Sequence, residues 1–182
     1  MKNIPIALTL SRILFIPVIF IFYFLPYGWA HPLAAILLAL TAFTDWLDGY
    51  LARSLSQVTQ LGAFLDPVAD KLLVAVALVM LLSTHQIPYL SVAAAIIIGR
   101  EIAISALREW MSAVGKRVSV KVTEMAKYKT AMQMLALVML VWYHPGSYFW
   151  LKWCGAILLY FSAILTIWSM LIYLKAAWPD LK

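Results

Sequence analysis

Residues 45–70 read DWLDGYLARSLSQVTQLGAFLDPVAD and carry four aspartates, Asp45, Asp48, Asp66 and Asp70, where two long apolar segments of the chain meet. A connection this short joins consecutive helices as antiparallel neighbours, so both acidic pairs are expected at the same depth. Placing a carboxylate in a membrane costs roughly 2.5–3.5 kcal/mol on insertion scales, so such residues are candidates for a functional role. The stretch therefore predicts a helical membrane protein with a polar site between two helices.

The composition agrees with this prediction. The 182 residues are 65% hydrophobic and 12% charged, which is more apolar surface than one water-soluble core could bury. A membrane-spanning helix needs roughly 20 residues. The apolar runs are 4–25, 32–51, 68–82, 87–107, 131–143 and 149–174, and the short fifth run is expected to extend into 127–132. We predict an all-α polytopic bundle of six transmembrane helices that forms a single domain over residues 1–182.

Basic residues concentrate at the two chain ends and in the second and fourth connections. They are Lys2, Arg53, Lys116, Arg117, Lys121, Lys127, Lys129, Lys175 and Lys182. Because Lys and Arg are enriched on the cytoplasmic side of membrane proteins, both termini are expected in the cytoplasm, with the acidic site at the cytoplasmic interface. The net charge of +6 then reflects topology and anionic lipid headgroups, and it gives no reason to expect nucleic acid as a partner.

The aspartates are spaced so that each pair shares a helix face with small residues. Asp45, Asp48, Gly49 and Ala52 fall within an arc of about 100°, at about 100° per residue. Gly62, Asp66 and Asp70 form a second stripe at a spacing of four. Four converging carboxylates without His or Cys favour Mg²⁺ or Mn²⁺. Pro67 predicts that the third helix begins or kinks at Asp66.

A purely structural alternative is that the acids pair with Arg53, Lys71 and Arg100 in a buried ion network. The small residues beside the aspartates favour a cavity over such a network. Arg12 leaves two interpretations open, because its side chain could extend to the cytoplasmic interface or approach a lipid diphosphate.

The arrangement of these residues resembles the signature of the CDP-alcohol phosphatidyltransferases. Its eight fixed positions are Asp45, Asp48, Gly49, Ala52, Arg53, Gly62, Asp66 and Asp70. The resemblance implies two metal ions held by the four aspartates, with Asp70 also acting as the base that deprotonates the acceptor hydroxyl. It further implies a CDP-lipid site formed by Asp48, Gly49, Ala52, Arg53 and Gly62.

Other segments resemble one bacterial branch of this family. They are Asn3-Ile4-Pro5 with Leu8, Thr9 and Arg12, the stretch 99–110, and residues 127–130 with Gln133. This branch transfers the phosphatidyl group of CDP-diacylglycerol to sn-glycerol 3-phosphate, giving phosphatidylglycerol phosphate and CMP. The resemblance therefore implies those two substrates, membrane lipid as surroundings, a multi-pass location in the bacterial inner membrane, and a homodimer.

A phosphorylated acceptor needs cationic partners, and Arg suits bidentate phosphate contacts. We expect Arg108 first, then Lys127, Lys129 and Arg100, with Arg117 and Lys121 as electrostatic support. The competing interpretation is that these residues only mark topology, and it is weakest for Arg100, which lies within an apolar run.

Two alternatives for function stay open at this point. The same chemistry could serve another acceptor, such as inositol phosphate or serine. Intramembrane acids also build cation carriers and channels. The aspartates lie toward the helix ends and beside Gly49, Ala52 and Arg53, which suits a nucleotide better than a bare ion.

Overall fold

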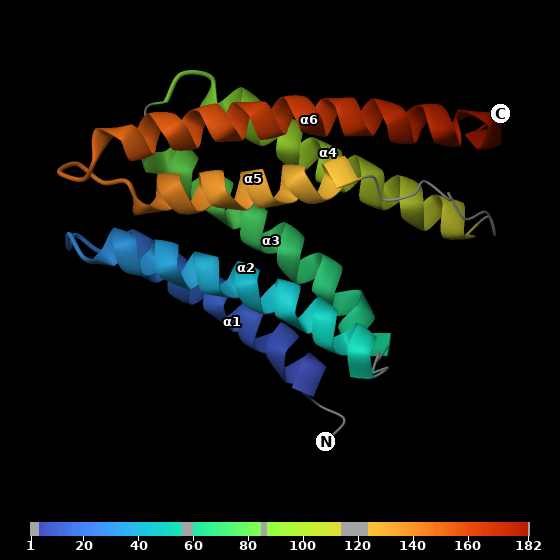
Figure 1. Ribbon diagram of the computed structural model, residues 1–182, viewed down its shortest axis with the longest axis horizontal. Helices are drawn as coiled ribbons and strands as arrows, with labels where there is room; N and C mark the ends of the chain where they lie inside the picture. Colours follow the sequence, from blue (N-terminus) through green and yellow to red (C-terminus); the bar gives the residue numbers. More distant parts are fainter. Residues whose placement is uncertain (1–3, 56–59, 85–86, 114–123, 182) are drawn as a thin grey trace.

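A computed structural model describes residues 4–55, 60–84, 87–113 and 124–181, with the side chains of 4–10, 45–55, 60–64, 66, 113, 124–127 and 176–181 left undescribed. In these ranges the chain is all-α (Figure 1). The helices are α1 (Ile4–Tyr23), α2 (Ala30–Leu55), α3 (Gln60–Thr84), α4 (Leu90–Ala113), α5 (Glu124–Trp142) and α6 (Phe149–Leu181). The predicted fold class, an all-α membrane bundle, is confirmed.

Successive helices run in opposite directions along the long axis of the bundle. The starts of α1, α3 and α5 and the ends of α2, α4 and α6 all lie toward one end, on the right in Figure 1. The ends of α1, α3 and α5 and the starts of α2, α4 and α6 lie toward the opposite end, where Gly146 has a backbone φ of 105° in the turn before α6. The helix ends nearest to the basic segments of the sequence therefore share one end of the bundle.

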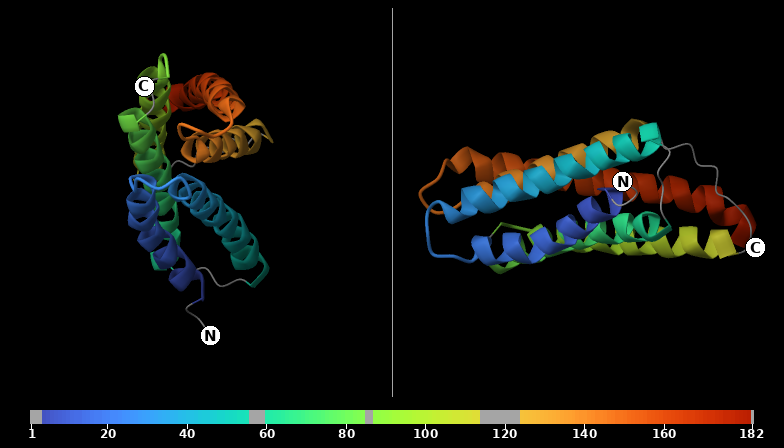
Figure 2. Two further views of the ribbon diagram at one scale, coloured as in Figure 1. Left: turned by 90° about the vertical axis from the view of Figure 1, so that its left-hand side faces the viewer. Right: turned by 90° about the horizontal axis from the view of Figure 1, so that it is seen from below.

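The helices pack into two neighbouring groups joined through α3 and α5. In Figure 2, α1 packs beside α2 and α3, while α5 lies against α6 and also contacts α2 and α3. Helix α4 packs on α6 and α3. The shared core consists of fully buried aliphatic side chains, among them Leu38, Leu78, Leu81, Ile97, Leu137, Leu140 and Leu159. Side chains from α2, α3, α4, α5 and α6 thus share one core.

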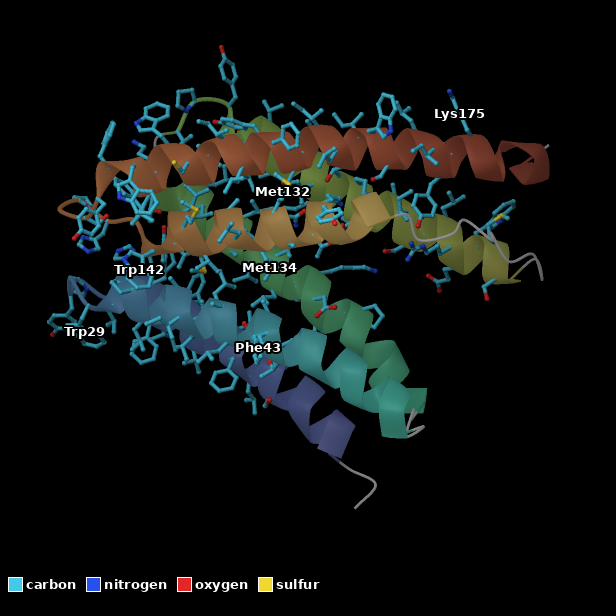
Figure 3. All side chains as sticks on the ribbon, viewed as in Figure 1. Trp29, Phe43, Met132, Met134, Trp142 and Lys175 are labelled. Atoms are coloured by element: carbon cyan, nitrogen blue, oxygen red, sulfur yellow. The ribbon has the colours of Figure 1, made fainter. Side chains whose placement is uncertain are left out.

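Large apolar side chains cover the outside of the bundle. Figure 3 shows the sticks that project from the helices, including Phe43 on α2, which is 56% exposed. Others are Leu14, Val79, Ile102, Ile157 and Trp168. A water-soluble monomer does not expose apolar surface of this extent, so the surface fits a lipid environment.

Three helices contain a stretch that is long and apolar enough to cross a membrane. These stretches are Pro67–Thr84, Leu90–Ser112 and Phe149–Lys175. Shorter apolar stretches occupy Ser11–Tyr23, Ala30–Thr44 and Tyr128–Trp142 within the side chains described. The six predicted spans thus correspond to six helices, and crossing by all six stays a prediction.

Two predicted helix boundaries can be compared with the structure. Of the two alternatives raised by Pro67, a third helix that begins at Asp66 is wrong, because α3 starts at Gln60 and continues through Pro67. A kink at Asp66 stays a prediction. A proline removes one backbone donor, and membrane helices tolerate this loss where the freed carbonyl finds other partners. The predicted extension of the fifth helix through 127–132 is confirmed, since α5 begins at Glu124.

Candidate functional site

A pocket of about 300 Å³ lies between α3, α4, α5 and α6. It is lined by Pro67, Asp70, Lys71 and Val74 of α3, Arg100, Glu101 and Arg108 of α4, Lys129, Thr130 and Gln133 of α5, and Tyr173 of α6. Four of these side chains are basic and two are carboxylates, an excess of two positive charges. A low-dielectric cavity with this balance attracts an anion.

Glu101 joins two of the cations through a single oxygen atom. Its Oε1 lies 3.0 Å from Nη1 of Arg100 and 3.4 Å from Nζ of Lys129. Lys129 is only 4% exposed, and the next turn of α5 places the buried Gln133 on the same wall. A buried ammonium needs a nearby negative charge, so Glu101 offsets the cost of holding Lys129 in the pocket.

Helix α6 contacts both arginines of the pocket. Nη2 of Arg100 donates to Oγ of Ser169 at 3.1 Å, and Nη2 of Arg108 donates to Oη of Tyr173 at 2.9 Å. The Arg108 guanidinium also lies over the Tyr173 ring, 5.2 Å from its centroid. Helix α6 therefore restricts the positions that the two guanidinium groups can adopt.

Asp70 pairs with an arginine from the first helix. Nη1 of Arg12 donates to Oδ1 of Asp70 at 3.0 Å, and Arg12 is 1% exposed while the Asp70 side chain is 45% exposed. Of the two interpretations left open for Arg12, extension to the interface does not agree with this burial. The structural alternative named Arg53, Lys71 and Arg100 as partners of the aspartates, and Arg12 is an additional partner of Asp70 among the described side chains.

The pocket gathers four of the residues expected from the sequence. Asp70, Arg100, Arg108 and Lys129 come together from three helices. The side chains of Asp45, Asp48, Gly49, Ala52, Arg53, Gly62, Asp66 and Lys127 lie outside the described part, as do Arg117 and Lys121 altogether. At the level of the backbone, the end of α2 and the start of α3 lie at the same end of the bundle (Figure 1).

Two residues of this site were not expected from the sequence. Ser169 and Tyr173 are polar positions one helical turn apart in the apolar run 149–174. This spacing puts them on one face of α6. A polar stripe in a membrane helix is a signal, but it does not reveal which neighbouring helix it meets.

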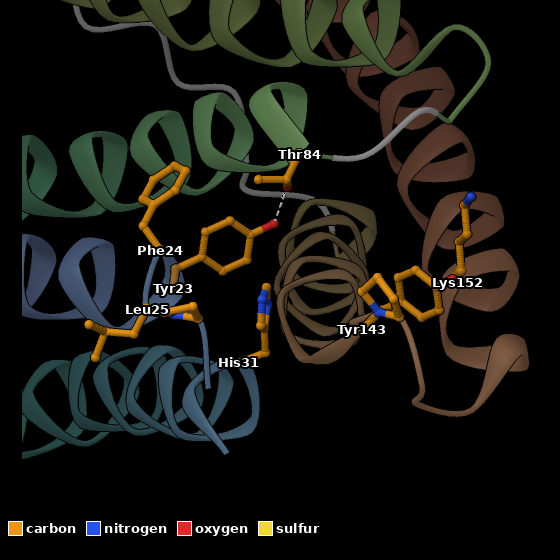
Figure 4. Close-up of a pocket in the computed structure, with 9 residues that line it drawn as sticks. Tyr23, Phe24, Leu25, His31, Thr84, Tyr143 and Lys152 are labelled. Atoms are coloured by element: carbon orange, nitrogen blue, oxygen red, sulfur yellow. Dashed lines mark hydrogen bonds between the residues drawn. The ribbon is translucent and has the colours of Figure 1, made fainter. Parts of the chain in front are cut away.

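A second pocket, of about 560 Å³, lies at the opposite end of the bundle (Figure 4). Tyr23 hydrogen-bonds Thr84 there, and the His31 ring lies 4.8 Å from the Tyr23 ring. Among the described residues that line it, Lys152 is the only Lys or Arg, and none is a carboxylate. The described part of this lining therefore lacks the acid and base pairing found beside Asp70.

Comparison with known proteins identifies the family. The family model for CDP-alcohol phosphatidyltransferase matches residues 2–168. The CDP-diacylglycerol–glycerol-3-phosphate 3-phosphatidyltransferase of Pseudomonas fluorescens is 52% identical over 181 residues, covering 99% of this chain and 92% of that protein. The proteins of the same name from Salmonella typhimurium and Escherichia coli K12 are each 48% identical over 179 residues, covering 98% of this chain and 97% of theirs. The signature at residues 45–70 and these matches together place the chain in the CDP-alcohol phosphatidyltransferase family.

Proposed function

We propose that this protein transfers the phosphatidyl group of CDP-diacylglycerol to sn-glycerol 3-phosphate, giving phosphatidylglycerol phosphate and CMP. The relatives that match nearly the whole chain carry the name of this activity. The observation that carries the proposal is that Asp70 and four basic side chains line the same pocket. Such a pocket suits an acceptor that brings both a hydroxyl and a phosphate.

The acceptor phosphate binds the basic residues of the pocket. Arg100 and Arg108 supply paired N–H donors, and Lys129 supplies a compact positive charge. Lys127 is a further candidate on α5. A phosphate dianion would complement the excess of two positive charges in the pocket, whereas the zwitterion serine would not. The pocket therefore favours a phosphorylated acceptor.

Asp70 is the base in this proposal. The acceptor hydroxyl oxygen attacks the phosphorus that bears the diacylglycerol, its proton passes to the Asp70 carboxylate, and the bond from that phosphorus to the CMP oxygen breaks. Arg12 holds the Asp70 carboxylate in place through the 3.0 Å contact. General-base assistance of this kind contributes about 10² to 10⁴ in rate.

Members of the family generally depend on a metal. Asp70 provides an oxygen donor on the pocket wall, and hard oxygen donors suit Mg²⁺ or Mn²⁺. Two such ions would be held by Asp45, Asp48, Asp66 and Asp70, and when bound they would offset the negative charge of the diphosphate. The CDP group would bind beside them.

We assign the CDP-lipid site to the signature residues around the α2–α3 connection. Asp48, Gly49, Ala52, Arg53 and Gly62 would surround the cytidine diphosphate. Small residues leave room for the nucleotide, and Arg53 offers a cation to its phosphates. The acyl chains would then extend into membrane lipid from this end of the bundle.

The proposal includes a cellular arrangement. The single domain over residues 1–182 would cross the bacterial inner membrane six times, with both termini and the active site at the cytoplasmic face. The basic connections support this orientation. We also propose a homodimer in the membrane.

Purified protein in detergent tests the reaction. With CDP-diacylglycerol, sn-glycerol 3-phosphate and Mg²⁺, we expect CMP release that requires all three, together with a lipid product that carries the second phosphate. Serine and inositol phosphate, each offered in place of glycerol 3-phosphate, are the controls. CMP release with one of them but none with glycerol 3-phosphate would reassign the acceptor.

A liposome assay addresses the other class of function. Cation flux through protein that releases no CMP under any acceptor condition would support a carrier or channel. CMP release without flux is the expected result.

A further inference from the structure

Two side chains of α6 contact the arginines of the pocket. Ser169 contacts Arg100 and Tyr173 contacts Arg108. The signature stretch 45–70 belongs to α2 and α3. The two contacts therefore join the arginines of the pocket to a helix outside the signature.

Tyr173 restrains Arg108 by two kinds of contact. The phenol oxygen accepts a hydrogen bond from Nη2 at 2.9 Å, and the guanidinium lies over the ring at 5.2 Å. Arg108 is an exposed residue, and an exposed arginine otherwise keeps many rotamers. Fixing it before the ligand arrives lowers the entropy cost of binding.

Ser169 is oriented so that its lone pairs face Arg100. Its Oγ donates to the carbonyl oxygen of Thr166 at 2.9 Å, which uses the hydroxyl proton. The same Oγ accepts from Nη2 of Arg100 at 3.1 Å. The serine is thus an acceptor toward the arginine, and Arg100 is held from two sides by Ser169 and Glu101.

We propose that Ser169 and Tyr173 are positioning residues that hold Arg100 and Arg108 ready for the phosphate of the acceptor. The inference rests on the proposed function and deepens it. It assigns acceptor specificity to α6, outside the signature. Ser169 and Tyr173 act through the two arginines and not through Asp70, so their loss weakens acceptor binding and leaves the chemical step intact.

Steady-state kinetics of Tyr173→Phe and Ser169→Ala test this role. Each variant removes one hydrogen bond to a charged group. We therefore expect the KM for glycerol 3-phosphate to rise about 10- to 100-fold. The kcat and the KM for CDP-diacylglycerol should stay within twofold of the parent. Tyr173→Leu also loses the ring contact and should raise the acceptor KM further.

Tyr160→Phe is the matched control. It removes a hydroxyl from the same helix at the other end of the bundle, where that hydroxyl donates to the carbonyl oxygen of Pro88. Its acceptor KM should equal that of the parent. Equal changes in both KM values and in kcat for Tyr173→Phe, or the same change in Tyr160→Phe, would overturn the positioning role.

A double-mutant cycle separates this inference from the proposed function. In an Arg108→Ala background, Tyr173→Phe should have no further effect on the acceptor KM, because the group it positions is gone. Additive effects would contradict the inference while leaving the reaction itself unaffected. If the parent protein shows no turnover with glycerol 3-phosphate, it is the proposed function that fails.

Discussion

Arg12 on α1 and Asp70 on α3 form an ion pair at 3.0 Å across 58 positions of sequence. The Arg12 side chain is 1% exposed. The Asp70 side chain is 45% exposed and lines the 300 Å³ pocket between α3, α4, α5 and α6. The pair therefore fixes a half-exposed acid from its buried side. This gives α1, which contributes nothing else to the described pocket lining, a part in the arrangement of the site.

Arg12→Met should lower kcat by about tenfold or more. The substitution keeps an apolar stem of similar length but removes the guanidinium that donates to the Asp70 carboxylate. Misplacement of a catalytic group by about 1 Å can cost about 10² in rate. Arg12→Lys keeps the charge and should recover part of the loss. CMP release at saturating substrates measures both.

Thermal unfolding of the Arg12 variants distinguishes positioning from general damage. If Arg12→Met lowers kcat only in proportion to the fraction of protein that is folded, Arg12 is structural and has no separate effect on Asp70.

Asp70→Asn should lower kcat by about 10² to 10⁴, because the amide has almost the same shape and cannot accept the hydroxyl proton. The variant should retain part of its binding of CDP-diacylglycerol, since most of the proposed CDP-lipid site lies elsewhere. Single-turnover CMP release and equilibrium binding of the CDP-lipid measure the two effects separately. Turnover equal to that of the parent would remove Asp70 from its role as base.

The helices were predictable because apolar runs and turn residues alternate along the chain. Breakers such as Pro26, Pro88 and Pro145 mark the ends of these runs, and the runs correspond to α1–α6. The alternative in which α3 begins at Asp66 was wrong, because the helix continues across Pro67 although the residue before a proline disfavours helical geometry. Packing against α1 and α5 outweighs one lost hydrogen bond.

Four residues that line the pocket were expected from the sequence, whereas several of their contacts were not. Arg100 in an apolar run indicated a buried functional cation, and Arg108 followed two turns later. The contact of Arg12 with Asp70 and that of Tyr173 with Arg108 join helices far apart in sequence. Helical periodicity gives the face of each residue but not the neighbour that the face meets, so these contacts required the structure.

Gly155→Ala should destabilise the bundle by about 1–3 kcal/mol. An added Cβ would lie 2.8 Å from Cγ of Leu140 and 3.3 Å from the carbonyl oxygen of Ala136, at the contact between α5 and α6. Leu140 is fully buried, so it has little room to shift. Unfolding in detergent followed by circular dichroism measures the change.

Gly99→Ala is the control for this substitution. No heavy atom of the described residues that could obstruct it lies within 4 Å of a Cβ added at that helical position. Alanine loses less conformational freedom on folding than glycine does. The substitution should therefore stabilise the protein by about 0.5–1 kcal/mol. A Gly155→Ala variant as stable as Gly99→Ala would show that α5 and α6 do not pack this closely.

Glu101→Gln should lower the free energy of unfolding by about 1.5–3 kcal/mol. The neutral amide leaves Lys129, which is 4% exposed, and Arg100 without the carboxylate that lies 3.4 Å and 3.0 Å from them. Glu109→Gln on the same helix is the control, because Glu109 is exposed and its loss should change stability by no more than about 0.5 kcal/mol.

Glycerol 3-phosphate should partly rescue Glu101→Gln, because a bound phosphate brings negative charge back to Lys129 and Arg100. A ligand that binds only the folded state raises the Tm with its concentration, and tighter binding gives a larger rise. We therefore expect a larger rise in Tm with glycerol 3-phosphate for Glu101→Gln than for the parent, and equal rises for Glu109→Gln and the parent. The same rise in all three proteins would mean that the phosphate does not approach Lys129, and the acceptor would have to bind elsewhere.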